Sequence, residues 1–195
     1  MEVLTDLLKF VHVIGFVFMT VPLFNLIVVN ERALLGVSFN YYADRYMENI
    51  IKHGAYRCFV FQSTVLITGI LLLVLGPGIE LLWSNWIVLV KTILLFTLMG
   101  LLSYVHFSLQ PRIESLISDI TPDSEISGDL ISQLKPYRVR RKWLATVCLF
   151  LVLTSIILGL QVYSLYNPLL TIGLIILAGL FSLKVNQTLI RFGWI

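Results

Sequence analysis

Five apolar runs, each long enough to cross a lipid bilayer, constrain this chain more than any other feature. The hydrocarbon core of a bilayer is about 30 Å thick, so a helix needs about 20 mostly apolar residues to span it. Hydropathy and helix breakers place the predicted spans at about 7–29, 56–75, 83–108, 142–163 and 168–186. Because 58% of the 195 residues are hydrophobic and 13% are charged, a soluble domain could not cover the apolar surface. The sequence therefore predicts an all-α integral membrane bundle of five transmembrane helices, forming one domain over 1–195.

Two longer polar stretches, 30–55 and 110–141, separate these spans. The first has a helical pattern and is expected to extend the second span beyond the bilayer. The second contains a Ser/Asp/Pro/Gly-rich loop, SDITPDSEISGD, followed by the basic run KPYRVRRK. The N-terminus lacks the basic region and the small-residue cleavage site of a signal peptide. The first apolar run is therefore expected to remain as a helix.

The distribution of basic residues predicts the orientation. Only Lys9 and Lys91 lie toward one side of the predicted bundle. The basic residues on or near the other side are Arg32, Arg45, Lys52, Arg57, Arg112, Lys135, Arg138, Arg140, Arg141, Lys142, Lys184 and Arg191. By the positive-inside rule the crowded side is cytoplasmic. We therefore expect an outside N-terminus, a cytoplasmic C-terminus, and a location in a prokaryotic-type inner or plasma membrane.

Several functional classes have no support in the sequence. The formal charge of +3 is too small to favour nucleic acid, and no basic stripe alternates with aromatic residues. Cys58 and Cys148 have no CxxC or CxxCH spacing, which argues against a disulfide framework and covalent haem attachment. The chain has no HExxH, P-loop or glycine-rich nucleotide motif. No acidic residue lies in the apolar core of a predicted span, which disfavours a proton-coupled transporter.

The three histidines and one intramembrane lysine are the candidate functional residues. His12 and Lys91 lie near the outer ends of the first and third spans, so they are predicted to share a depth. His106 lies 15 residues beyond Lys91, roughly 22 Å along the helix, and His53 precedes the second span. The sequence thus predicts an outer pair, His12 with Lys91, and an inner pair, His53 with His106. Imidazole is a common axial ligand of haem iron, and a neutral lysine amine could also ligate.

Lys91, His12 and His53 also have structural interpretations. Lys91 could extend its ammonium to the interface, and His12 could simply bond a neighbouring carbonyl. His53 lies in a polar segment where a solvated histidine is ordinary. Arg138, Arg140 and Arg141 are interpreted as an anchor for anionic lipids, with contacts to haem propionates as the alternative.

The first and third spans resemble a known family. They read KFVHVIGFVFMTVPLFNL and WIVLVKTILLF, and the order of helices and loops also agrees. In these features the chain resembles the HemJ/CopD-type membrane family, whose HemJ branch contains oxygen-independent protoporphyrinogen IX oxidases. That resemblance implies haem b bound at the first-helix histidine and third-helix lysine, here His12 and Lys91. The chain departs from the family at IVVNERALL, at VRRKWLA, and at the displaced pair Tyr104 and His106, and these departures weigh more against the oxidase activity than against haem binding.

The leading hypothesis is a haem-b-binding membrane protein that acts as an electron-transfer subunit. His12 and Lys91 would hold the haem iron, and His53 with His106 would be a further cofactor site. Expected partners are membrane lipids and other redox subunits or copies of the same chain, without nucleic acid. The alternatives are a HemJ-like protoporphyrinogen IX oxidase and a cofactor-free accessory subunit of a membrane complex. The sequence assigns no catalytic residue.

Overall fold

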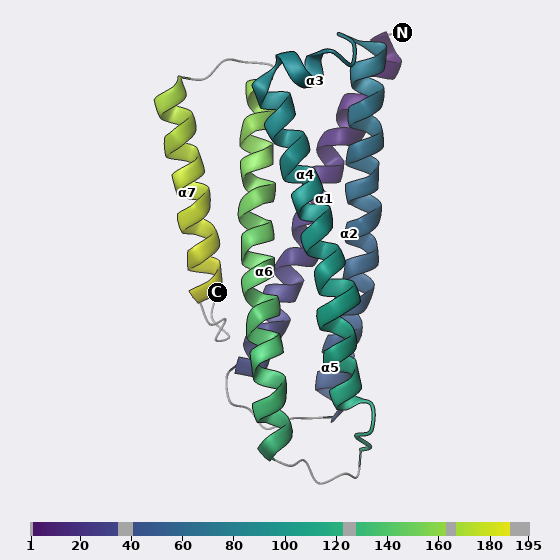
Figure 1. Ribbon diagram of the computed structural model, residues 1–195, viewed down its shortest axis with the longest axis vertical. Coiled ribbons are helices and arrows are strands. Elements are labelled where there is room, and N and C mark those ends of the chain that lie inside the picture. The colour runs from purple at the N-terminus through teal and green to yellow at the C-terminus, as the bar shows by residue number, and fades with distance from the viewer. Residues whose placement is uncertain (1, 35–40, 123–127, 163–166, 188–195) are drawn as a thin grey trace.

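The computed structural model is a bundle of long helices lying side by side (Figure 1). It describes residues 2–34, 41–122, 128–162 and 167–187. The elements are α1 Glu2–Leu34, α2 Tyr41–Leu75, α3 Leu81–Ser84, α4 Trp86–Tyr104, the π-helical η1 Val105–Leu109, α5 Gln110–Ile117, α6 Gly128–Gln161 and α7 Pro168–Gln187. The end of the bundle that carries the start of α1 and α3 is called the upper end, and the end with α5 and the start of α2 the lower end (Figure 1).

Five segments are long and apolar enough to cross a membrane. They are Glu2–Ile27, Tyr41–Leu75, Trp86–Ile117, Gly128–Gln161 and Pro168–Gln187. These segments confirm the predicted all-α architecture and its five candidate spans. Large apolar side chains on the outside of the helices, such as Phe10, Ile67 and Phe96, are exposed, as expected for a surface that faces lipid tails.

The helices extend beyond the spans that hydropathy predicts. The polar stretch before the second span is helical from Tyr41 onward, as expected, and the basic run KPYRVRRK lies inside α6. The third span was predicted to begin at Trp83, but that residue lies in the separate helix α3. Asn85 begins α4 instead, because its side-chain oxygen accepts a hydrogen bond from Ile87 N at 2.9 Å. The predicted loop SDITPDSEISGD lies partly outside the described residues.

The main core lies between α1, α2, α4 and α6. Met19, Val65, Leu98 and Leu149 are at most 1% exposed and belong to one apolar cluster. α7 lies at the edge of the bundle beside α6 (Figure 1). The core therefore depends on four helices, and these four, with η1 directly after α4, carry the candidate site residues.

α1 and α2 approach each other closely at Gly15. A Cβ atom built on Gly15 would lie 2.7 Å from Val65 Cγ2, which is closer than real contacts allow. Glycine at this position lets the two helix backbones pack together, as small residues commonly do between membrane helices. The approach positions His12, one turn earlier on α1, against α2.

Candidate functional site

His12 is held by a hydrogen bond to α2. Its Nδ1 lies 3.0 Å from Thr68 Oγ1, and that hydroxyl lies 2.6 Å from the carbonyl oxygen of Thr64. A hydroxyl has one proton to donate, and Thr68 donates it to a backbone carbonyl of the preceding turn. Thr68 therefore accepts at its oxygen, and the His12 Nδ1–H is the donor. This assigns the tautomer of the neutral ring and leaves the lone pair on Nε2.

The His12 ring is also confined by its neighbours. It meets Phe16 edge-on, with centroids 5.5 Å apart and planes at 74°. A Cβ atom at Gly69 would lie 3.2 Å from His12 Cε1, so a larger residue there would press on the ring. The packing fixes the orientation in which Nε2 is presented.

Lys91 lies beside His12 at the upper end of the bundle. Its Nζ packs against α6 at Gly159, which has no side chain. A Cβ atom built on Gly159 would lie 3.4 Å from Lys91 Nζ. The ammonium is close enough to His12 for an electrostatic interaction. Within the described part of the chain, no carboxylate forms an ion pair with Lys91. The outer pair predicted from depth thus lies together, between α1, α2, α4 and α6.

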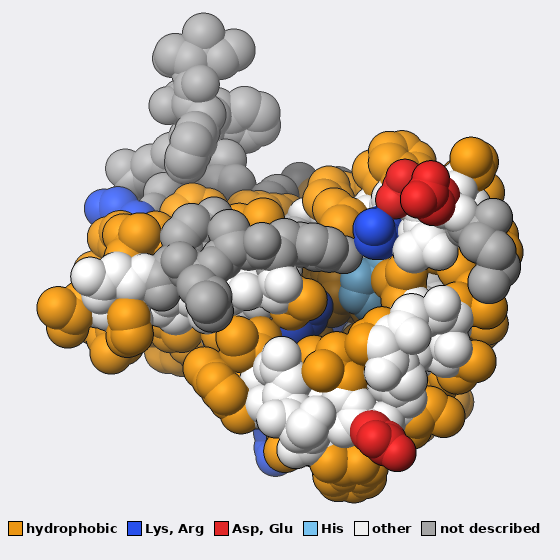
Figure 2. Space-filling model, turned by 90° about the horizontal axis from the view of Figure 1, so that it is seen from above, with side chains coloured by type: hydrophobic (Ala, Val, Ile, Leu, Met, Phe, Trp, Pro, Cys, Tyr) orange, Lys and Arg blue, Asp and Glu red, His pale blue; other side chains and the backbone are white. Residues whose placement is uncertain are grey.

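The upper end of the molecule is hollowed. Figure 2 views this end and shows a histidine side chain inside a depression, with lysine or arginine side chains beside it and apolar side chains around the rim. The view is consistent with a site at the upper end that can be reached from outside the bundle.

His106 lies in a cage of aromatic rings. Its ring centroid is 5.0 Å from Tyr56, 5.8 Å from Phe59 and 4.9 Å from Phe107, all in edge-on arrangements. Its Nδ1 is buried and has no hydrogen-bond partner among the described residues. His106 lies on η1, and the wider π turn changes the direction in which its side chain points.

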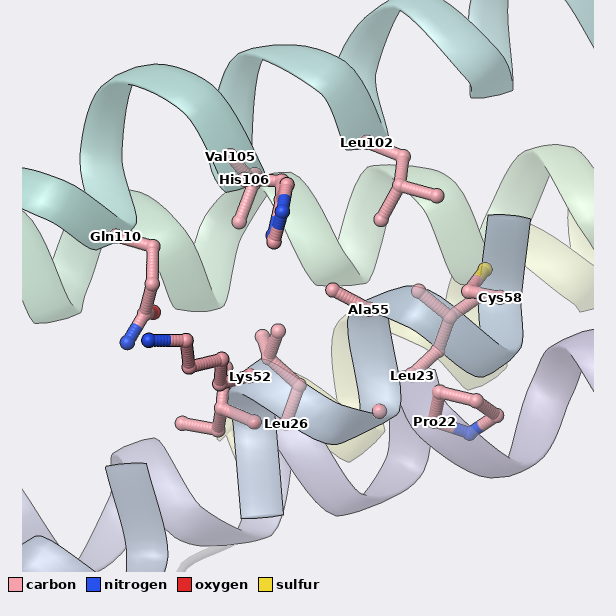
Figure 3. Close-up of a pocket in the computed structure, with 12 residues that line it drawn as sticks. Pro22, Leu23, Leu26, Lys52, Ala55, Cys58, Leu102, Val105, His106 and Gln110 are labelled. Atoms are coloured by element: carbon pink, nitrogen blue, oxygen red, sulfur yellow. The ribbon is translucent and has the colours of Figure 1, made fainter. Parts of the chain in front are cut away.

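A small cavity of about 30 Å³ lies next to His106 (Figure 3). Lys52 and Gln110 extend toward each other at one end of it, and apolar side chains such as Leu23 and Leu102 form much of the rest. A cavity of this size could hold one water molecule. It is too small for a cofactor.

His53 does not join His106 in a common site. It is exposed on α2, its Nδ1–H donates to the carbonyl oxygen of Asn49 at 2.8 Å, and it lines a different, larger groove between α1 and α2. The two cavities share Pro22 and Gly54 as lining residues. The predicted inner pair is therefore divided between two cavities.

Three basic residues of the run on α6 are buried, Arg138, Arg141 and Lys142. Arg141 is fully buried and binds Glu48 of α2 through two bonds, Nη1 to Oε2 at 2.6 Å and Nη2 to Oε1 at 3.0 Å. Arg138 contacts the same carboxylate at 3.0 Å and Asp44 at 3.3 Å. Arg140 remains exposed, 5.3 Å above the Tyr104 ring. Arg138 and Arg141 thus face protein carboxylates, and a lipid or propionate contact at the cluster stays a prediction.

The acidic partners of these arginines were missed by the sequence reasoning. Asp44 and Glu48 are 6% and 4% exposed. A usable signal was present, because both continue the buried stripe of α2 backward from Ile51 and Cys58 in three- and four-residue steps. A buried acid on such a stripe requires a basic partner.

No family model matches the chain, and the searches of curated proteins and of solved structures also gave no match. The resemblance to the HemJ/CopD-type family stays a prediction. Within the described ranges, no group of three or more His, Cys, Asp or Glu side chains is placed to hold a metal ion. Haem needs no such group, because one or two axial ligands suffice.

Proposed function

We propose that this chain is a haem-b-binding membrane protein that serves as an electron-transfer subunit of a membrane redox complex. The observation that supports the proposal is the contact of His12 Nδ1 with the Thr68 hydroxyl, which itself bonds the Thr64 carbonyl. Thr68 holds the Nδ1–H, so Nε2 keeps its lone pair in a fixed direction. Iron-ligating histidines have this arrangement, in which the second ring nitrogen donates to a neighbouring group.

The surrounding residues fit a haem in their chemistry. His12 Nε2 is a suitable axial donor, and Lys91 is either the second ligand or a cation near the cofactor. Gly69 and Gly159 have no side chains, so the His12 ring packs closely against α2 and the Lys91 amine closely against α6. A bound haem supplies an iron that carries one electron at a time. The protein would hold the haem. Thr68 would orient the His12 ring, and Phe16, which packs against that ring, would limit the access of water.

The visible spectrum tests this proposal. Protein expressed with ample haem and purified in detergent should show a Soret band that is lost in His12→Ala and kept in His106→Ala and His53→Ala. Lys91→Met should keep the band but change its position if Lys91 ligates the iron. Wild-type protein without a Soret band would refute haem binding and leave the cofactor-free accessory subunit. A band that survives in His12→Ala and disappears in His106→Ala would show that the ligand is His106.

We also propose that the lower end of the bundle lies in the cytoplasm of a prokaryotic-type cell. The excess of Lys and Arg at that end supports this orientation. The exposed residues Ser84 in α3 and Ser115 in α5 provide labelling positions at opposite ends. In a variant without the native cysteines, a membrane-impermeant maleimide added to intact cells should label Ser84→Cys and spare Ser115→Cys. The opposite pattern would reverse the orientation.

A further inference from the structure

A groove of about 600 Å³ runs between α1 and α2 on the outside of the bundle. The described residues that line it all belong to these two helices. Pro22 of α1 lies next to Gly54 of α2. A Cβ atom built on Gly54 would lie 3.7 Å from Pro22 Cβ. The volume of the groove is within the range typical of small-molecule sites.

The end of the groove nearer the middle of the bundle is apolar. Phe18 and Phe61 pack there with ring centroids 5.6 Å apart and planes inclined at 32°, and Val21 also lines this end. Phe18 and Val21 are about half exposed. This end would suit a hydrocarbon chain.

The other end of the groove is polar and basic. Asn25, Tyr46, Asn49, His53 and Arg57 line it. Within the described part of the chain, Arg57 forms no ion pair. An exposed guanidinium among neutral donors favours an anionic group, and a phosphate can accept two of its hydrogen bonds.

The charges of α2 are sorted onto two faces. Its acids Asp44 and Glu48 are buried and bind arginines of α6. The face toward the groove carries Arg57 and His53, and the described residues that line the groove include no carboxylate. The positive charge at the groove is therefore not neutralised by the helix that carries it.

The depth of Arg57 matches that of a lipid headgroup. α2 ends at Leu75 at the upper end, and the rise of 1.5 Å per residue places Arg57 roughly 27 Å below it. This distance is close to the thickness of the hydrocarbon core, about 30 Å. Phe61 lies one turn deeper in the bilayer than Arg57.

We propose that this groove binds an anionic glycerophospholipid, with its phosphate at Arg57 and one acyl chain along Phe18 and Phe61. The site for an anionic lipid is therefore this groove rather than Arg138 and Arg141 of α6, which are bound to carboxylates. It does not depend on haem binding, because none of the described residues that line the groove belongs to the His12 site.

Lipid retention measured by native mass spectrometry tests the proposal. Detergent-solubilised full chain is titrated with phosphatidylglycerol or phosphatidylcholine of the same acyl composition. Wild-type protein should retain phosphatidylglycerol more strongly, and Arg57→Gln should weaken that retention roughly tenfold, as expected for one charge-assisted contact. Arg112→Gln is the matched control, because it removes an exposed cation at the lower end outside the groove. Its retention should equal that of wild type.

A steric variant gives a second readout. Val21→Trp keeps every charge but fills the groove, so it should also reduce phosphatidylglycerol retention. The proposal is overturned if Arg57→Gln and Arg112→Gln behave alike, or if both lipids are retained equally. A neutral quinone that displaces phosphatidylglycerol would also overturn the proposal, provided that Arg57→Gln leaves the binding of the quinone unchanged. Loss of a Soret band in both His53→Ala and Arg57→Gln would assign the groove to haem instead.

Discussion

Replacing Glu48 by glutamine should destabilise the bundle strongly. The Glu48 carboxylate accepts two hydrogen bonds from Arg141, at 2.6 and 3.0 Å, and lies 3.0 Å from Arg138. The side chains of Glu48, Arg141 and Arg138 are 5%, 0% and 8% exposed. Glu48→Gln leaves the Arg141 cation buried, with the amide oxygen of Gln110 as an acceptor. Removing one partner of a buried ion pair costs about 3–5 kcal/mol, and we expect a loss in this range.

An exposed ion pair at the same end supplies the control. Lys52 and Glu114 are 3.3 Å apart, but their side chains are 43% and 38% exposed. Exposed pairs contribute at most about 1 kcal/mol, so Lys52→Ala should have a small effect. The free energy of unfolding is measured by titrating detergent-solubilised protein with sodium dodecyl sulfate and following helix content by circular dichroism.

The comparison decides whether burial makes this cluster important for stability. Losses for Glu48→Gln and Lys52→Ala that agree within about 1 kcal/mol would contradict the reasoning. A double-mutant cycle adds a second check. Because Glu48→Gln removes the carboxylate that Arg141 binds, and Arg141→Gln removes one of the two cations that Glu48 binds, the double variant should lose less than the sum of the two single losses.

Two further predictions use the same unfolding titration. Asn85→Ala should cost about 0.5–2 kcal/mol, because it removes the oxygen that caps the first turn of α4, whereas Asn85→Asp keeps an acceptor and should cost less. Gly15→Ala should cost about 1–3 kcal/mol, since its Cβ would lie 2.7 Å from Val65 Cγ2. Adding Val65→Ala should recover part of that loss, and no recovery would show that the clash involves other atoms.

Hydropathy predicted the number of spans but not the ends of the helices. Apolar length is a direct requirement of the bilayer, so five long runs lead to five candidate spans. Helix ends outside the apolar region depend on capping and on tertiary contacts. α2 continues to Tyr41 with Asp44 and Glu48 bound to α6, and hydropathy contains no term for such pairing.

The level of each candidate side chain along the bundle was easier to predict than the face of the helix on which it lies. The fixed rise per residue placed His12 and Lys91 at one level, and the structure brings them together. The same reasoning placed His53 and His106 at one level, but it did not reveal the face on which each lies. His53 is on the outer face of α2, and the π turn of η1 sets the direction of His106. A π turn has no dependable sequence signal, so this part of the site could not be predicted.

The two polar clusters of α2 should act independently. Thr68, which orients His12, and Glu48, which binds Arg141, lie roughly 30 Å apart along the helix, with apolar core between them. Thr68→Val removes the bond to His12 and the bond to the Thr64 carbonyl, and should cost about 1–3 kcal/mol. Sites this far apart normally have additive effects, so the loss for Thr68→Val with Glu48→Gln should equal the sum within about 0.5 kcal/mol. A larger deviation would mean that α2 transmits changes between the ends of the bundle, and the His12 site would then depend on the arginine cluster at the lower end.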